Sequence, residues 1–256
     1  MRLHYEELGN GAPLVLLHGH TLDRRMWAGT APALAAGGYR VIMPDMAGHG
    51  LSEPPAAGST PAGDLAELLD TLGIAKAAIA GLSLGGAVAV NFARRYPGMS
   101  AALIPIDSAL FGYRFAEWAS TKPYVALART EGLARGLEAW LTDPLFAQAM
   151  ASPQIAQTVR SIVSEFPGHS WLGSAPSPVL PGPLDADQLH EIATPALVLN
   201  GESDLPDFLR IGERLAAEIP GAQRQVIPGA GHLLPVEQPE RFTAAVLRFL
   251  DALERW

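Results

Sequence analysis

Cysteine is absent from this chain of 256 residues. Disulfide bonds, thiolate metal ligands and cysteine nucleophiles are therefore excluded. Covalent catalysis by a nucleophile of this kind would have to use a hydroxyl group, and serine is the candidate.

Charged residues are also scarce, at 17% of the chain, and 18 basic against 26 acidic residues give a formal net charge of −8. Nucleic acids and anionic membrane surfaces bind a concentrated basic face, so neither is an expected partner. The adjacent pairs at 24–25 and 94–95 are arginines, which we expect on solvated helix surfaces. No apolar run is long enough to span a bilayer, and residues 1–7 lack the apolar segment of a secretory signal. We expect a cytoplasmic protein.

Apolar residues make up 48% of the chain, enough for one α/β domain with a large core. Short apolar runs alternate with helical patterns up to residue 106 and again from residue 195. Expected strands are 2–8, 13–17, 39–43, 77–80, 101–106, 195–201 and 222–227, and expected helices are 21–36, 62–72, 83–96, 207–219 and 239–254. This alternation predicts a doubly wound, mostly parallel sheet.

Between residues 111 and 187 the alternation stops, and helical patterns broken by prolines replace it. Nine of the eighteen aromatic residues (8 Phe, 5 Trp and 5 Tyr) lie in this segment. We expect 111–187 to form a helical cap on a core domain made of 1–110 and 188–256. Most of the aromatic rings should pack the cap onto the core, and a few should face the nucleophile.

The most informative stretch is the segment Gly-Leu-Ser-Leu-Gly-Gly at 81–86, which follows a short apolar run and precedes a long apolar one. It predicts a strand, a tight turn and a helix. The glycines that flank Ser83 suit a turn in which the serine backbone is strained and its neighbours must lack side chains. The helix would point its free N–H groups and the positive end of its dipole at an acyl group bound to Ser83.

This segment resembles the nucleophile elbow of the α/β-hydrolase fold, in its serine-nucleophile branch of esterases and lactonases. The resemblance implies that Ser83 is the nucleophile and that no cofactor is needed. The loop at 44–52 resembles the family's Asp-x-x-Gly-x-Gly-x-Ser loop, in which Asp45 would bond loop backbone rather than take part in chemistry.

The segment His-Gly-His at 18–20, with Trp27 after it, resembles the family's oxyanion loop. The resemblance implies an oxyanion hole made by the backbone N–H groups of His20 and Leu84. Each such donor is worth about 2.7 to 4 kcal/mol of transition-state stabilisation. The imidazole of His20 itself is as compatible with a bystander as with a substrate contact.

A serine hydroxyl needs a base that is oriented by a third group. We expect His232 to be the base, because it follows a strand end at the sheet edge where Ser83 lies. Asp107 and Asp204 both follow predicted strands at that edge. The segment 201–204 resembles the family's usual acid loop and Asp107 its less common acid position, so Asp204 is the expected acid. The order serine, acid, histidine also matches the family.

Two other kinds of site share part of these motifs. His18, His20 and Asp23 partly match a metallohydrolase box, but Leu22 and Asp23 stand where that box needs its aspartate and last histidine, so we expect no metal.

The segment 81–86 with Asp107 also mimics a dinucleotide-binding layout. Against that interpretation, Ser83 replaces the glycine that lets backbone approach a pyrophosphate, and His232 and Asp204 would be left without a role.

Serine as nucleophile favours hydrolysis of small carboxylic esters through an acyl-enzyme. It argues against the haloalkane dehalogenase and epoxide hydrolase branches, which place aspartate there. Enol-lactone hydrolysis and cofactor-free perhydrolysis use the same triad and stay open. Carbon–carbon bond hydrolysis is less favoured, because 18–27 lacks the extra glycines of those enzymes. A ligand receptor that keeps the triad without turnover is the alternative from another class.

Overall fold

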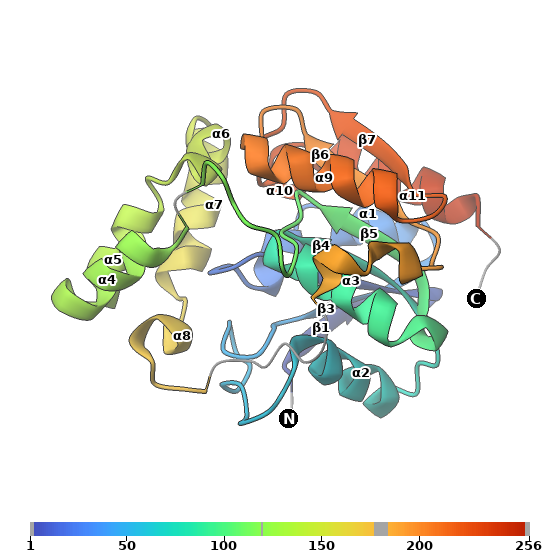
Figure 1. Cartoon of the computed structure of the whole chain (residues 1–256), viewed down its shortest axis with the longest axis horizontal. Coiled ribbons are helices and arrows are strands. Elements are labelled where there is room, and N and C mark those ends of the chain that lie inside the picture. The colour runs from blue at the N-terminus through green and yellow to red at the C-terminus, as the bar shows by residue number, and fades with distance from the viewer. Residues whose placement is uncertain (1–2, 119, 177–183, 254–256) are drawn as a thin grey trace.

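Figure 1 shows the computed structural model of the chain, which describes residues 3–118, 120–176 and 184–253. One sheet has the strand order β1-β3-β2-β4-β5-β6-β7. Only β1 pairs antiparallel, with β3, and the other neighbours pair parallel. The predicted mostly parallel, doubly wound sheet is confirmed. The strands are β1 (Tyr5–Leu8), β2 (Ala12–Leu17), β3 (Tyr39–Pro44), β4 (Ala77–Leu82), β5 (Ser100–Ile106), β6 (Leu197–Gly201) and β7 (Gln223–Ile227).

Helices cover both faces of the sheet (Figure 1). In β2, Leu14 and Leu16 pack in the apolar cluster that contains α1 and α11, whereas Val15 and Leu17 pack in the cluster of α2, α3 and α9. A strand that is buried on both faces explains the unbroken apolar run in its sequence. The helices of these layers are α1 (Ala31–Ala36), α2 (Pro61–Thr71), α3 (Leu84–Arg95), α9 (Pro206–Glu218), α10 (Leu234–Glu237) and α11 (Pro239–Asp251).

The described part of the segment between β5 and β6 is helical and contains no strand, as the sequence predicts. Its helices are α4 (Lys122–Glu131), α5 (Leu133–Trp140), α6 (Ala147–Met150), α7 (Pro153–Ser164) and α8 (His169–Leu172). They lie together at one side of the sheet (Figure 1). Residues 119 and 177–183 of the predicted cap are outside the described residues, and the division into core and cap stays a prediction.

The described chain also contains short 3-10 helices. They are η1 (Arg24–Trp27), η2 (Pro97–Met99), η3 (Pro144–Phe146), η4 (Asp185–Asp187) and η5 (Leu189–Glu191). The helical segment predicted at 21–36 is found as two short helices, η1 and α1, instead of one. The Asp23 side chain caps η1, and Pro32 lies in the first turn of α1, where its missing N–H does no harm. A continuous helix would place that proline in its interior.

The expectation that both arginine pairs are solvated is wrong for the first residue of each pair, whereas the side chain of Arg25 is 36% exposed and Arg95 is exposed. Arg24 forms ion pairs with the buried Asp45 at 2.9 Å and with Glu6 at 2.7 Å. The Arg94 side chain is only 9% exposed and lies 2.7 Å from the fully buried carboxylate of Asp185. A buried carboxylate needs a cation or several hydrogen-bond donors to compensate for its lost hydration, and the carboxylates of Asp45 and Asp185 each pair with an arginine. Among the helices of the described ranges, none has the length and apolar character required to cross a membrane.

Candidate active site

Ser83 lies in the turn between β4 and α3, with a φ of 53°. Positive φ is uncommon for a residue other than glycine. The Ser83 N–H donates to the Ile106 carbonyl at 2.9 Å, and the Ser83 carbonyl accepts from the Ala109 N–H at 3.0 Å. A side chain at Gly81 would collide with the backbone of Gly85. The end of β5 and the two glycines together therefore hold the serine in its strained conformation.

His232 and Asp204 lie in the loops that follow β7 and β6. The Nδ1 atom of His232 is 3.0 Å from Oδ1 and 3.1 Å from Oδ2 of Asp204. Asp204 also accepts the Leu205 backbone N–H at 2.7 Å. Because Nδ1 faces a carboxylate, we assign the ring proton to Nδ1, which leaves Nε2 as an acceptor. The ring of Phe208 packs on the imidazole with a centroid distance of 4.3 Å.

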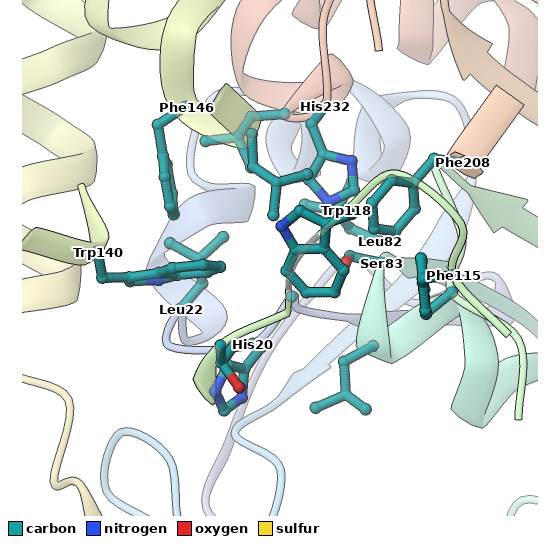
Figure 2. A pocket seen from close by; sticks show the side chains of 16 residues that line it. His20, Leu22, Leu82, Ser83, Phe115, Trp118, Trp140, Phe146, Phe208 and His232 are labelled. Carbon is teal, nitrogen blue, oxygen red and sulfur yellow. The ribbon is translucent and has the colours of Figure 1, made fainter. Parts of the chain in front are cut away.

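Ser83 and His232 line the same cavity, which has a volume of about 250 Å³. Figure 2 shows the imidazole of His232 directed toward Ser83. The structure thus brings the predicted base and acid into contact, and it places the predicted nucleophile at the cavity that the base faces. The roles assigned to the three residues stay predictions.

The cavity wall is largely apolar and aromatic (Figure 2). None of its described residues is a lysine, arginine, aspartate or glutamate. The segment between β5 and β6 contributes rings to the wall, as the sequence predicts. The apolar lining residues are Leu22, Leu82, Leu84, Ala109, Phe115, Trp118, Trp140, Leu145, Phe146, Phe208 and Leu233.

His20 and Leu84, the predicted oxyanion-hole residues, both line this cavity. Leu84 is the first residue of α3, so its N–H has no acceptor within the helix. Within the described chain, neither the His20 N–H nor the Leu84 N–H donates to a backbone carbonyl. Both N–H groups are therefore available to an oxyanion formed at Ser83.

The two histidines of the loop after β2 are neutral. Burial lowers the pKa of His18 to about 4 and the pKa of His20 to about 3, the latter with help from His49. His18 Nδ1 contacts the Gly19 carbonyl at 2.9 Å, and Nε2 accepts the Met46 N–H at 2.8 Å. Through these two contacts His18 ties the loop at 18–20 to the loop at 44–52.

The histidine at position 20 contacts the helical segment. Its Nε2 accepts the indole N–H of Trp171 at 2.8 Å, so the ring proton is on Nδ1. The indole N–H of Trp140 donates to Thr21 Oγ1, also at 2.8 Å. Two tryptophans of the helical segment therefore bind the loop that supplies one predicted oxyanion donor.

Asp45 bonds loop backbone, as expected: Oδ2 accepts the Leu51 N–H at 2.9 Å, and Oδ1 accepts the Arg24 N–H at 2.8 Å. Gly48 and Gly50 both have positive φ, at 76° and 50°.

Asp107, the competing acid, directly follows β5, has a φ of 41° and is fully buried. Its Oδ1 accepts the Gly201 N–H at 2.7 Å. Burial, followed by the charge of Asp204, raises the pKa of Asp107 well above its ordinary value. His232 hydrogen-bonds to Asp204, and no hydrogen bond joins it to Asp107 among the described residues.

Sequence reasoning missed Asp207, which holds the backbone at 116–118, a stretch that includes the lining residue Trp118. Its buried carboxylate accepts the backbone N–H groups of Ala116, Glu117 and Trp118 at 2.7 to 3.1 Å, and Arg210 lies 3.1 Å away. Burial alone would raise the pKa of Asp207, but these donors hold it below its ordinary value. An acidic residue in the first turn of a predicted helix indicates only a favourable dipole contact, so the sequence carried no signal for this role.

Comparisons with known proteins find relatives that match almost the whole chain. The model of the alpha/beta hydrolase family matches residues 14–245. A 2-hydroxy-6-oxononadienedioate/2-hydroxy-6-oxononatrienedioate hydrolase from Burkholderia vietnamiensis is 32% identical, over 98% of this chain and 91% of that protein. The enol-lactonase from Burkholderia xenovorans superposes with a TM-score of 0.83 at 30% identity, over 97% of this chain and 96% of its own. A thermophilic esterase from Thermogutta terrifontis gives a TM-score of 0.80 at 33% identity, over 97% and 93% of the two chains. The chain therefore belongs to the alpha/beta hydrolase family.

Proposed function

We propose that Ser83, His232 and Asp204 form a catalytic triad that hydrolyses small neutral carboxylic esters through an acyl-enzyme. The observation that carries the proposal is the hydrogen bond of 3.0 Å between His232 and Asp204, at a cavity whose wall includes a serine on a strained turn. Esterase and enol-lactonase relatives of the same fold support it.

In the first half-reaction, His232 Nε2 removes the proton of the Ser83 hydroxyl while Oγ attacks the ester carbonyl carbon. The carbonyl oxygen becomes an oxyanion that accepts hydrogen bonds from the N–H groups of His20 and Leu84. The intermediate then collapses, the alcohol leaves with the proton from Nε2, and the acyl group stays on Ser83. Asp204 stabilises the imidazolium that forms between these steps.

In the second half-reaction, water takes the place of the alcohol. His232 removes a proton from the water, the resulting hydroxide attacks the acyl carbon, and the collapse returns that proton to Ser83 as the acid is released. Each half-reaction uses the same oxyanion hole. No group beyond the three side chains and the two N–H groups is required.

The wall of the cavity favours a neutral substrate. A carboxylate that enters an apolar cavity loses its hydration, and none of the described lining residues supplies a cation to replace it. We therefore infer an ester with an apolar or aromatic acyl group. An uncharged lactone meets the same requirement and is the second candidate, supported by the enol-lactonase neighbour. Relatives whose names denote dioate substrates act on molecules with two carboxylates, which this cavity does not favour.

We also propose that residues 111–187 act as a cap over a core of 1–110 and 188–256. The rings of Phe115, Trp118, Trp140 and Phe146 support this proposal, because they enclose the space in front of Ser83. Enclosure by rings lowers the local dielectric constant and strengthens the hydrogen bonds to a developing oxyanion.

The test combines labelling with turnover. A serine-directed fluorophosphonate should form an adduct on Ser83, and the Ser83→Ala variant should not be labelled. Uncharged aryl esters and lactones should then be compared with esters that carry a carboxylate in the acyl group. Fast turnover of neutral esters supports the proposal. Labelling of Ser83 with no turnover of any ester or lactone would favour a receptor, and labelling elsewhere would refute the triad.

A further inference from the structure

Two carboxyl groups lie together behind His232. Asp107 directly after β5 and Asp204 after β6 are buried, with 0% and 6% of their residue surfaces exposed. Both contact Gly201, because Asp107 Oδ1 accepts the Gly201 N–H at 2.7 Å and the Asp204 N–H donates to the Gly201 carbonyl at 3.3 Å, and the two carboxyl groups act on each other. The His232 base uses only Asp204. The proposed triad therefore leaves a fully buried second acid without an assigned role.

The hydrogen bonds of the two groups are unequal. Asp204 accepts from the Leu205 N–H and from His232 Nδ1. Asp107 accepts from the Gly201 N–H with Oδ1, whereas Oδ2 is buried and has no donor among the described residues. Two ionised carboxylates in one buried site repel each other, so one of them holds a proton, and that one is the group with fewer donors. An Oδ2 without a donor is the position expected for that proton.

We propose that Asp107 is protonated and donates its Oδ2 hydrogen to the Asp204 carboxylate, so that it acts as a positioning residue for the acid of the triad. Asp204 then receives three donors from three directions, and its carboxylate cannot rotate away from His232. The positioning role depends on the proposed function, whereas the protonation of Asp107 does not depend on it.

The charged groups around the pair agree with this assignment. The negative charges of Asp204 and, to a smaller extent, Glu237 both make ionisation of Asp107 harder. Glu237 is held by the N–H groups of Gly231 and Leu233, in the loop that carries His232. Burial, the largest cause, also raises the pKa of Asp107.

The decisive variant is Asp107→Asn, because an amide reproduces both contacts of a protonated carboxyl group. Its N–H₂ can donate to Asp204, and its oxygen can accept the Gly201 N–H. Asparagine also tolerates the positive φ at this position. We expect kcat/KM within about threefold of the parent enzyme and an acidic limb of the pH–rate profile that does not move.

The rival assignments give different results for the same variant. If Asp107 is ionised, the substitution removes a negative charge near the imidazole, and the acidic limb moves down by about one pH unit or more. If Asp107 is itself the orienting acid, kcat falls by about 10⁴. Either result would overturn the proposal.

The positioning role needs a variant that cannot donate. Asp107→Leu keeps the approximate size of the side chain but lacks the donor. We expect kcat to fall at least about tenfold with little change in KM, and Asp107→Asn to restore it. Equal loss in both variants would indicate a merely structural role. Should the leucine variant fail to fold, the pH profile of Asp107→Asn still decides.

The proton itself can be observed without any substrate. The infrared spectrum of the intact protein should contain the carbonyl band of a protonated carboxyl group at about pH 8, above the pKa of about 6 of Asp64. The band should be lost in Asp107→Asn. It should persist in Asp207→Asn, a matched control in which the replaced carboxylate is buried but ionised. A band that survives in Asp107→Asn would refute the protonation even if the enzyme hydrolyses esters as proposed.

Discussion

Replacement of the Asp204 carboxylate by the isosteric amide, Asp204→Asn, should abolish most of the hydrolytic activity without unfolding the chain. The Leu205 N–H donates to Oδ1 at 2.7 Å, so the amide oxygen is expected to take that position. The amide N–H₂ then occupies the position of Oδ2, which is 3.1 Å from His232 Nδ1. A donor at that place competes with the oxygen at the Oδ1 position, 3.0 Å from Nδ1, and favours the tautomer with the proton on Nε2, in which the imidazole cannot accept the proton of Ser83.

The magnitude follows from the loss of the correct tautomer. Such a loss lowers kcat by about 10⁴ in a serine triad, which corresponds to roughly 5 kcal/mol of transition-state stabilisation. KM should change little, because Asp204 does not line the described cavity wall. The assay is steady-state hydrolysis of a neutral aryl ester, with circular dichroism and thermal unfolding to show that the fold is intact.

The matched control is the same substitution at the neighbouring acid, Asp107→Asn, which leaves His232 facing Asp204. A folded Asp204→Asn enzyme with more than about a tenth of the parental kcat would refute the assignment of the acid. A large loss in Asp107→Asn beside a small loss in Asp204→Asn would move the role to the end of β5.

Three further predictions concern the cavity and the stability of the fold. An ester whose acyl group ends in a carboxylate should have a kcat/KM at least about 100-fold below that of its uncharged isostere, because none of the described lining residues is a cation that could replace the lost hydration of the carboxylate. Equal rates would contradict the inference of a neutral substrate. Burial raises the pKa of Asp64 to about 6 in the folded state. The protonated carboxyl group therefore favours the folded state fully at a pH below the pKa of the unfolded chain, and this contribution is lost as pH rises through 6. Asp64→Asn should therefore raise the free energy of unfolding by roughly 1 to 2 kcal/mol at pH 8, discounted for partial solvent screening, and by little at pH 4 in urea titrations. Arg94→Met should cost roughly 3 kcal/mol in the same measurement, because it removes the ion pair with the buried carboxylate of Asp185, and a cost below about 1 kcal/mol would show that Asn91 and the charge of Arg95 suffice.

Much of the sheet could be predicted because most strands appear in the sequence as short apolar runs that are bounded by turn residues and separated by helical patterns. The strand at β2 was expected at 13–17 and is found at Ala12–Leu17. The helical segment expected at 21–36 consists of two short helices, because the side chain of Asp23 caps the first and Pro32 lies in the first turn of the second. Local hydrogen bonds and proline geometry override periodicity over so short a distance.

The site was predictable to the extent that its residues follow strand ends. His232 and Asp204 were expected to meet because the carboxyl ends of parallel strands lie at one edge, and they are in contact. The sequence placed Asp107 at the same edge but could not show that β5 pairs directly with β6, which brings Asp107 against Gly201. Nor could it show that Asp207 holds the backbone at 116–118, a contact across some 90 positions of the chain.

The helical segment and the oxyanion loop depend on each other through two indole N–H groups. Trp171 donates to the ring of His20 and Trp140 donates to Thr21, each at 2.8 Å. Thr21 has a φ of 61°, an unfavourable conformation for a β-branched residue, so the loop needs outside contacts to keep it. A movement of α5 and α8 away from the sheet would break these contacts and release the backbone that presents the His20 N–H. The geometry of the proposed oxyanion hole is therefore coupled to the positions of α5 and α8 through this pair of hydrogen bonds.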